Sequence, residues 1–178
     1  MENMRLLFER AFQLFLPNER NNITNQVHER NLCGRLAIRL EAVAFEFELK
    51  GYYADTEYNR NLNGKVKTIL DGEMEVVAIT CDLILHSRGE CIPRDNLIAV
   101  EMKKNSRPPA TKDADRKRLR ALTKSSYDDV WSNDGIALPE HVCGYDIGIY
   151  AELDVRNQRF MVEEYREGNL FESRYFSF

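Results

Sequence analysis

Two strand-like segments of the sequence carry charged side chains whose spacing could serve catalysis. Residues 96–103 alternate as a strand would, so Glu101 and Lys103 emerge on one face. Asp82 lies in the preceding segment, residues 76–86, and a hairpin between the two segments would bring it within reach of Glu101. Two neighbouring carboxylates repel each other unless a proton or a cation lies between them. A hard divalent cation such as Mg²⁺, which takes oxygen ligands, would satisfy that need.

A lysine beside such a cation suits the hydrolysis of phosphodiester bonds. Lys103 could orient or deprotonate an attacking water, or balance negative charge in the transition state. The alternative is that Glu101 and Lys103 form an exposed ion pair of little energetic value. The tripeptide alone is weakly diagnostic, because Glu48-Leu49-Lys50 has the same form at a predicted helix end. The strand acid before Glu101 distinguishes the two tripeptides.

Glu29 falls on the apolar stripe of a helix predicted at residues 23–47. It precedes Leu32 by three residues and Leu36 by seven, so a helix of about 3.6 residues per turn directs it toward the core. A carboxylate there needs a metal ion, a basic side chain or backbone donors, because its desolvation is costly. The alternative is that Glu29 lies at the edge of the core and pairs with a surface base.

The remaining pattern predicts helices and strands that alternate within one domain. The chain has 178 residues and a mass of 20.8 kDa, a size typical of a single core. Helical spacing of apolar residues predicts helices at residues 2–15, 23–47 and 113–123. Alternating or β-rich segments predict strands at residues 52–58, 76–86, 96–103, 145–153 and 159–165, the last two joined by a hairpin turn. The predicted order is helix, helix, three strands, helix, two strands and a tail.

Charge is unevenly distributed along the chain, although its net charge is only −4. Residues 101–124 hold nine basic and three acidic side chains, whereas residues 125–178 hold four basic and eleven acidic ones. A local concentration of positive charge favours binding to a polyanion such as nucleic acid. The predicted phosphate contacts are Arg60, Arg116, Lys117 and Arg120. The alternative is that these side chains only solvate the surface.

Other classes of site are disfavoured by the sequence. The four cysteines include no CxxC pair, and the three histidines show no HxxxH or HExxH spacing, which counts against zinc sites and disulfide frameworks. No apolar stretch approaches the roughly 18–20 residues that cross a bilayer, and charges interrupt the apolar N-terminus. We therefore expect a cytoplasmic protein with reduced cysteines and no membrane partner.

Taken in order, these residues resemble the PD-(D/E)XK nuclease superfamily. The set consists of Glu29, Asp82 and Glu101-Met102-Lys103, followed by a helix rich in Lys and Arg, within roughly residues 23–153. The resemblance implies an α/β, restriction-endonuclease-like fold: a central mixed sheet flanked by helices, with an α-βββ-α-β core. The helix at residues 2–15 would be an addition to that core. Cys81 stands where the name of the motif records a proline, a departure that affects the expected fold and metal binding little.

The resemblance also implies a role for each matching residue. Asp82, Glu101 and the backbone carbonyl of Met102 would hold Mg²⁺ or Mn²⁺. Lys103 would be the catalytic lysine, and Glu29 would be the acid that the first core helix adds to the same site. This role for Glu29 agrees with its place on the apolar stripe.

These inferences predict a metal-dependent nuclease that hydrolyses phosphodiester bonds of DNA, with RNA as the second choice. Its partner would be nucleic acid, and a homodimer is compatible with the cutting of two strands at two sites. The alternative is a catalytically inactive member of the same fold that binds nucleic acid or a protein partner, since fold does not fix function. The acidic segment at residues 125–178 would suit a basic protein. Metal binding distinguishes the two hypotheses.

Overall fold

The computed structural model describes residues 2–57, 68–70, 76–78, 81–91, 94–124 and 144–178. The helices are α1 (Glu2–Asn18), α2 (Arg20–Thr24), α3 (Glu29–Glu46) and α4 (Pro109–Leu122). The strands are β1 (Tyr53–Thr56), β2 (Thr68–Leu70), β3 (Val76–Ala78), β4 (Leu83–His86), β5 (Asn96–Lys104), β6 (Ile147–Asp154), β7 (Arg159–Arg166) and β8 (Asn169–Ser177).

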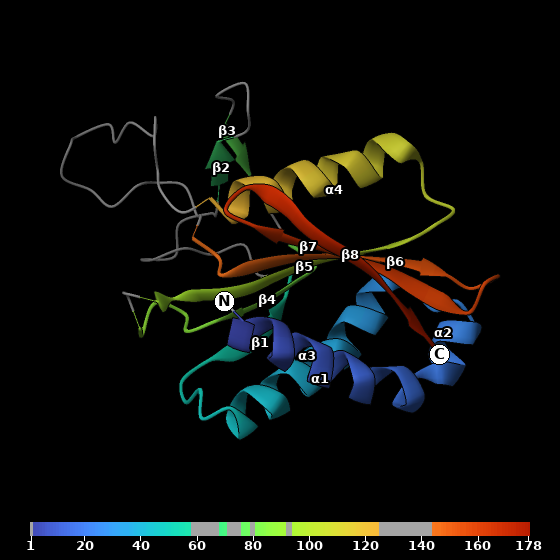
Figure 1. Cartoon of the computed structure of the whole chain (residues 1–178), viewed down its shortest axis with the longest axis horizontal. Coiled ribbons are helices and arrows are strands. Elements are labelled where there is room, and N and C mark those ends of the chain that lie inside the picture. Colours follow the sequence, from blue (N-terminus) through green and yellow to red (C-terminus); the bar gives the residue numbers. More distant parts are fainter. Residues whose placement is uncertain (1, 58–67, 71–75, 79–80, 92–93, 125–143) are drawn as a thin grey trace.

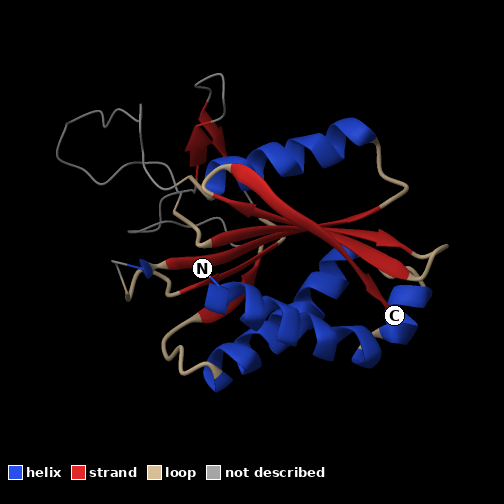
Figure 2. Cartoon of the chain, viewed as in Figure 1, coloured by secondary structure: helices blue, strands red, loops and turns tan. Residues whose placement is uncertain are grey.

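A six-stranded mixed sheet forms the middle layer, in the order β1-β4-β5-β6-β7-β8. Strands β2 and β3 pair with each other in a separate two-stranded sheet. Helices α1 and α3 cover one face of the large sheet, and α4 lies across the other (Figure 1; Figure 2). The described chain is therefore an α/β structure built on an open mixed sheet.

The connections determine how the strands pair. β1 is antiparallel to β4, and β4 is antiparallel to β5. β5 and β6 are parallel and are joined through α4, because a parallel pair requires a long crossover. β6, β7 and β8 continue as antiparallel neighbours. The hairpins predicted between β4 and β5 and between β6 and β7 are confirmed.

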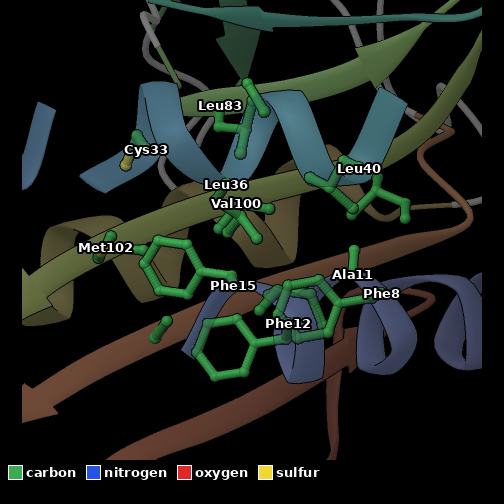
Figure 3. Close-up of a cluster of buried hydrophobic side chains, with 14 of the residues drawn as sticks. Phe8, Ala11, Phe12, Phe15, Cys33, Leu36, Leu40, Leu83, Val100 and Met102 are labelled. Carbon is green, nitrogen blue, oxygen red and sulfur yellow. The ribbon is translucent and has the colours of Figure 1, made fainter. Parts of the chain in front are cut away.

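Aromatic side chains of α1 fill the layer between the helices and the sheet. Phe8, Phe12 and Phe15 recur every three or four residues, so they share one face of α1, where all three are buried. Phe12 meets Phe160 of β7 edge to face, with ring centroids 5.2 Å apart. Figure 3 shows these α1 rings in one cluster with Leu36 of α3. Both helices thus contribute to a common core on this face.

The core on the opposite face is smaller and lies under α4. Leu119 and Leu122 of α4 pack there against Tyr150 of β6. Gly148 permits the close approach of helix and sheet, because a Cβ at this position would lie 3.0 Å from Cγ2 of Thr123. A side chain at Gly148 would therefore press α4 away from the sheet.

Three helices differ in their boundaries from the prediction, and one of them is α4, which spans Pro109–Leu122 rather than residues 113–123. α1 ends at Asn18 rather than at residue 15, and Nδ2 of Asn18 donates to the Leu14 carbonyl at 2.7 Å, which satisfies the last turn. α3 begins at Glu29 rather than at residue 23, because His28 caps it by accepting a hydrogen bond from the Arg30 N–H at 3.3 Å. None of the helices in the described residues is both long and apolar enough to cross a membrane.

Three strand predictions need correction, and one concerns β2 (Thr68–Leu70), where no strand is predicted from the sequence. The segment at residues 76–86 is divided, since β3 pairs with β2 whereas β4 joins the large sheet. The predicted tail is instead strand β8, which runs antiparallel to β7. Glu167 and Gly168 both have positive φ and reverse the chain between these two strands. The tail therefore completes the sheet at one edge.

Candidate functional site

Five charged side chains meet on the α4 face of the sheet, near the start of β4. Asp82 directly precedes β4, Glu101 and Lys103 lie on β5, and Asp115 and Arg118 lie on α4. Side chains alternate between the two faces along β5. Met102 packs into the core under α1 and α3, so its neighbours Glu101 and Lys103 point toward α4 on the other face. We call these five residues the ion cluster.

Carboxylates and cations alternate through the ion cluster. Lys103 Nζ lies 3.2 Å from Asp82 Oδ2 and 3.3 Å from Asp115 Oδ2. Arg118 Nε donates to Glu101 Oε1 at 2.6 Å, and Arg118 Nη2 donates to Asp115. Three carboxylates thus face two cations, which leaves one negative charge in excess when all five groups are ionised.

Glu101 is the most enclosed member of the ion cluster. Its exposed fraction is 0%, and burial, followed by the negative charge of Asp82, raises its pKa to about 8. Arg118 opposes this rise without cancelling it. The second carboxyl oxygen, Oε2, is buried and makes no hydrogen bond within the described part of the chain. Below pH 8 the carboxyl group is therefore mostly protonated, which balances the charge of the ion cluster.

Lys103 is a cation rather than a base in these surroundings. Burial alone would lower its pKa, but Asp82, Asp115 and Glu101 together raise the pKa above its ordinary value. Burial also raises the pKa of Asp115, and Lys103 and Arg118 oppose that rise. A protonated ammonium group can orient water or neutralise phosphate charge, but it cannot take a proton. Of the roles predicted for Lys103, these surroundings disfavour deprotonation of the attacking water.

The backbone of β5 borders the ion cluster as well. The Met102 N–H donates to Asp82 Oδ2 at 2.9 Å. Because the N–H and C=O of one strand residue point to the same side, the Met102 carbonyl lies along the edge of β5 that faces Asp82. Asp82, Glu101 and the Met102 carbonyl, the three predicted metal ligands, are thus neighbours.

Cys81, at the position where the motif's name records a proline, is a buried thiol next to Asp82. Its Sγ donates to the Val100 carbonyl at 3.3 Å. Burial, with the nearby charges of Glu101 and Asp82, raises the pKa of Cys81 well above its ordinary value. The group stays a neutral thiol, and neutral thiols are poor metal ligands.

Glu29 lies next to the ion cluster but binds other groups. From the first turn of α3 it accepts the Lys104 N–H at 3.1 Å and two hydrogen bonds from Arg107, at 2.8 and 2.6 Å. Hydrogen bonding to Arg107 outweighs burial and lowers the pKa of Glu29 to about 2. Within the described residues, its hydrogen bonds and ion pairs do not join it to Asp82 or Glu101.

The basic side chains predicted to contact phosphate are engaged to different degrees. Arg116 makes two hydrogen bonds to Glu163, at 2.8 and 3.2 Å, and stacks 4.2 Å above a tyrosine ring of the sheet. Arg120 lies 5.1 Å above a second tyrosine ring. Lys117 is the one exposed side chain among the three predicted on α4. Arg60 lies outside the described residues.

Sequence reasoning missed two members of the ion cluster, Asp115 and Arg118. Asp115 did carry a signal, because it precedes Leu119 by four residues and Leu122 by seven, as an inward-facing helical position does. Its exposed fraction is 3%. Arg118 carries no such signal, since it is one of nine basic residues within positions 101–124 and only tertiary contacts single it out.

The oxygen atoms of the ion cluster are of the type that binds a hard divalent cation. Carboxylate and carbonyl oxygens are the ligands of Mg²⁺ and Mn²⁺, and the buried Glu101 Oε2 has no hydrogen-bond partner within the described residues. Among the described residues, however, no three His, Cys, Asp or Glu side chains converge as a metal-binding group. Mg²⁺ usually binds through one or two carboxylates and completes its shell with water and substrate oxygens. Asp82, Glu101 and the Met102 carbonyl meet that smaller requirement.

Comparison with known proteins identifies no relative: no protein-family model, curated protein or solved structure matches this chain.

Proposed function

We propose that the protein is a metal-dependent nuclease of the PD-(D/E)XK type, acting on DNA and, as the second choice, on RNA. One observation carries the proposal: Asp82, Glu101 and Lys103 meet in one cluster, and Glu101 keeps a buried oxygen without a partner in the described residues. Structural ion pairs usually satisfy both oxygens of a buried carboxylate. An unsatisfied oxygen beside a second carboxylate favours a site that awaits a cation.

The arrangement of the elements supports the same proposal. Apart from β2 and β3, which lie between β1 and β4 in the chain and form a separate sheet, the elements α3, β1, β4, β5, α4 and β6 have the order that the PD-(D/E)XK resemblance implies. Antiparallel β1, β4 and β5 lie beside a parallel β6, joined through α4. In this arrangement the tripeptide Glu101-Met102-Lys103 lies on a central strand, β5. We therefore assign the finer fold, restriction-endonuclease-like, as part of the proposal.

The proposed chemistry divides between a bound ion and the chain's own side chains. Asp82, Glu101 and the Met102 carbonyl would hold Mg²⁺ or Mn²⁺, which supplies Lewis-acid stabilisation of negative charge on phosphate oxygens when bound. Lys103, kept protonated by the surrounding carboxylates, orients the attacking water and neutralises charge on the phosphate. Asp115 positions Lys103 through their 3.3 Å ion pair.

The experiment that tests the proposal is a cleavage assay on several polymers. Supercoiled plasmid, linear duplex, single-stranded DNA and RNA are incubated with the wild type in Mg²⁺, in Mn²⁺ and in chelator. We expect metal-dependent cleavage that Glu101→Gln abolishes. The matched control is Glu164→Gln, because Glu164 is equally buried and burial likewise raises its pKa, yet it lies outside the ion cluster. Equal cleavage by the wild type and Glu101→Gln would refute the proposed mechanism.

A catalytically inactive scaffold is the second candidate, and one observation favours it. Lys103 and Arg118 already neutralise the carboxylates of the ion cluster, and no three-residue metal group converges among the described residues. A scaffold of this kind would bind nucleic acid or a protein through its fold alone. It predicts no Mn²⁺ binding in calorimetry and no cleavage of any polymer under the conditions above.

A further inference from the structure

Arg118 closes the ion cluster over Glu101. Its Nε donates to Glu101 Oε1 at 2.6 Å, and its Nη2 donates to Asp115. The Glu101 side chain is fully buried, whereas the Arg118 side chain keeps 22% of its surface exposed. Arg118 therefore binds the buried carboxyl from the α4 side of the sheet and is itself in contact with solvent.

A comparison within the same chain shows how the Arg118 pair differs from a structural ion pair. Glu164, which is also buried, pairs with Arg166 through Oε1 and with Arg174 through Oε2. Both oxygens of that carboxylate are satisfied, whereas the buried atoms there without a hydrogen bond in the described residues, Nη2 of Arg166 and Nε of Arg174, are donors that a cation cannot bind. Glu101 has Arg118 on Oε1 only, and Oε2 makes no hydrogen bond within the described residues. The Glu101 site is therefore incomplete in a way that the Glu164 site is not.

Charge makes Arg118 a competitor of any divalent cation at this position. A cation bound to Glu101 and a guanidinium bound to the same carboxylate repel each other strongly in a buried setting. The repulsion is relieved when rotations of the long Arg118 side chain carry the guanidinium away from Glu101. Asp115 retains the guanidinium nearby, because it is bound from the same helix three residues earlier.

We infer that Arg118 is an internal counter-ion, which occupies Glu101 in the metal-free protein and leaves it when a divalent cation binds. The inference rests on the proposed function, since it needs a cation at Glu101. It adds that Arg118 weakens metal binding. A purely structural arginine would do the opposite, because its removal would disorder Glu101 and lower the affinity for metal.

Calorimetric titration with Mn²⁺ alone tests this inference, because it shows whether removal of Arg118 strengthens or weakens Mn²⁺ binding. We expect Arg118→Met to bind Mn²⁺ at least about tenfold more tightly than the wild type. The matched control Arg166→Met removes the arginine from the equally buried Glu164 and should leave Mn²⁺ affinity unchanged. Equal or weaker binding by a folded Arg118→Met variant, with binding by the wild type intact, would overturn the inference and leave the proposed function standing.

A second measurement uses the wild type and so does not depend on the variant's folding. The Nε–H resonances of the arginine side chains are followed by NMR during titration with Mg²⁺. We expect the Arg118 resonance to lose its hydrogen-bonded shift while that of Arg166 stays in place. An unchanged Arg118 resonance at saturating Mg²⁺ would contradict the displacement. Absence of metal binding by both the wild type and Arg118→Met would remove the proposed function and this inference together.

Discussion

At the scale of single residues, the buried carboxyl of Glu101 is held at a cost to stability. Its folded-state pKa of about 8 lies above the ordinary value of 4.5, so the unfolded chain loses this proton at lower pH than the folded protein does. Protonated Glu101 therefore makes its full contribution to the free energy of unfolding below pH 4.5. This contribution is lost as the pH rises toward 8. Burial raises the pKa of Glu164 in the same direction, so the raised pKa of Glu101 follows from its burial and does not by itself assign a function.

Glu101→Gln should therefore raise the free energy of unfolding at alkaline pH. We expect the variant to be more stable than the wild type by about 1–3 kcal/mol at pH 8.5, with a smaller difference at pH 5. The neutral amide avoids the desolvation of a buried carboxylate, which is the physical reason. Urea denaturation at the two pH values measures the effect. Parallel pH profiles for the two proteins would show that Glu101 does not titrate in this range.

Glu29 has the opposite linkage, because Arg107 and the Lys104 N–H stabilise its ionised form. Folding lowers its pKa from 4.5 to about 2. Ionised Glu29 therefore contributes to the free energy of unfolding above pH 4.5, and this contribution is lost as the pH falls toward 2. We expect Glu29→Gln to lower the free energy of unfolding by about 1–2 kcal/mol at pH 7, a value reduced by the partial exposure of Arg107. The difference should vanish in denaturation experiments near pH 2. A constant difference across this range would contradict the ion pair.

The residues of the candidate site were predictable to unequal degrees. Glu101 and Lys103 follow from the period of two along β5, and the predicted hairpin brings Asp82, which directly precedes β4, beside them. Glu29 was correctly predicted to need a partner, but the sequence could not select Arg107 from the many bases. Arg118 could not be predicted because its role depends on how α4 lies over β5, which no local pattern encodes.

At the scale of elements, the position of α4 determines the geometry of the ion cluster. The helix supplies Asp115 and Arg118, and its approach to β6 depends on Gly148. Thr123 and Leu119 lie within 3.0 and 3.3 Å of the place that a Cβ at this position would take. Contacts this close must shift when a side chain is added, so the helix would move with respect to β5.

Gly148→Val should therefore destabilise the fold and loosen the ion cluster. We expect a loss of about 1–3 kcal/mol in the free energy of unfolding, as in other overpacked cores. Gly34→Ala is the matched control, because a Cβ at Gly34 meets nothing within 4 Å and should stabilise α3 by about 0.5–1 kcal/mol. Urea denaturation of both variants tests the pair. Equal stability of Gly148→Val and the wild type would refute the packing argument.

The elements themselves were largely predictable, and the errors have physical causes. Central strands β5 and β6 are continuous apolar or alternating runs, so their existence follows from the sequence. Strand β8 was missed because Glu172 and Arg174 lie on its inward side, where they pair with Arg5 and Glu9 of α1. An edge strand whose inward positions are charged does not show the usual apolar alternation.

At the scale of the whole molecule, folding neutralises much of the charge segregation seen along the chain. The basic segment at residues 101–124 and the acidic segment that follows meet where α4 lies on β6 and β7. Lys112 Nζ lies 3.3 Å from a Glu152 oxygen, and Arg116 binds Glu163 at 2.8 Å. Part of the positive charge attributed to nucleic-acid binding is thus used inside the protein. Strands β6 and β7 supply acidic partners within the same chain.

Arg116 and Lys117 should consequently differ when each is replaced. We expect Arg116→Gln to lower the free energy of unfolding by about 1–2 kcal/mol, because it leaves Glu163 without its bidentate partner. Lys117→Gln should leave the free energy of unfolding unchanged. Under the proposed function it should weaken duplex binding and reduce the slope of log affinity against log salt concentration by about one. Denaturation and binding at several salt concentrations separate the two effects. The reverse pattern would contradict these assignments.

The central claim is that the ion cluster hydrolyses phosphodiester bonds with the help of a divalent cation. Its most direct test is single-turnover cleavage of a labelled DNA duplex in Mn²⁺ by the wild type and Asp82→Asn. Asp82 is partly exposed and lies outside the regular strand, so the variant should fold normally. We predict cleavage by the wild type that chelator stops and Mn²⁺ restores, and a rate lower by more than about 100-fold in Asp82→Asn. Cleavage at the same rate by both proteins, or a wild type that binds Mn²⁺ without cutting any nucleic acid, would contradict the claim.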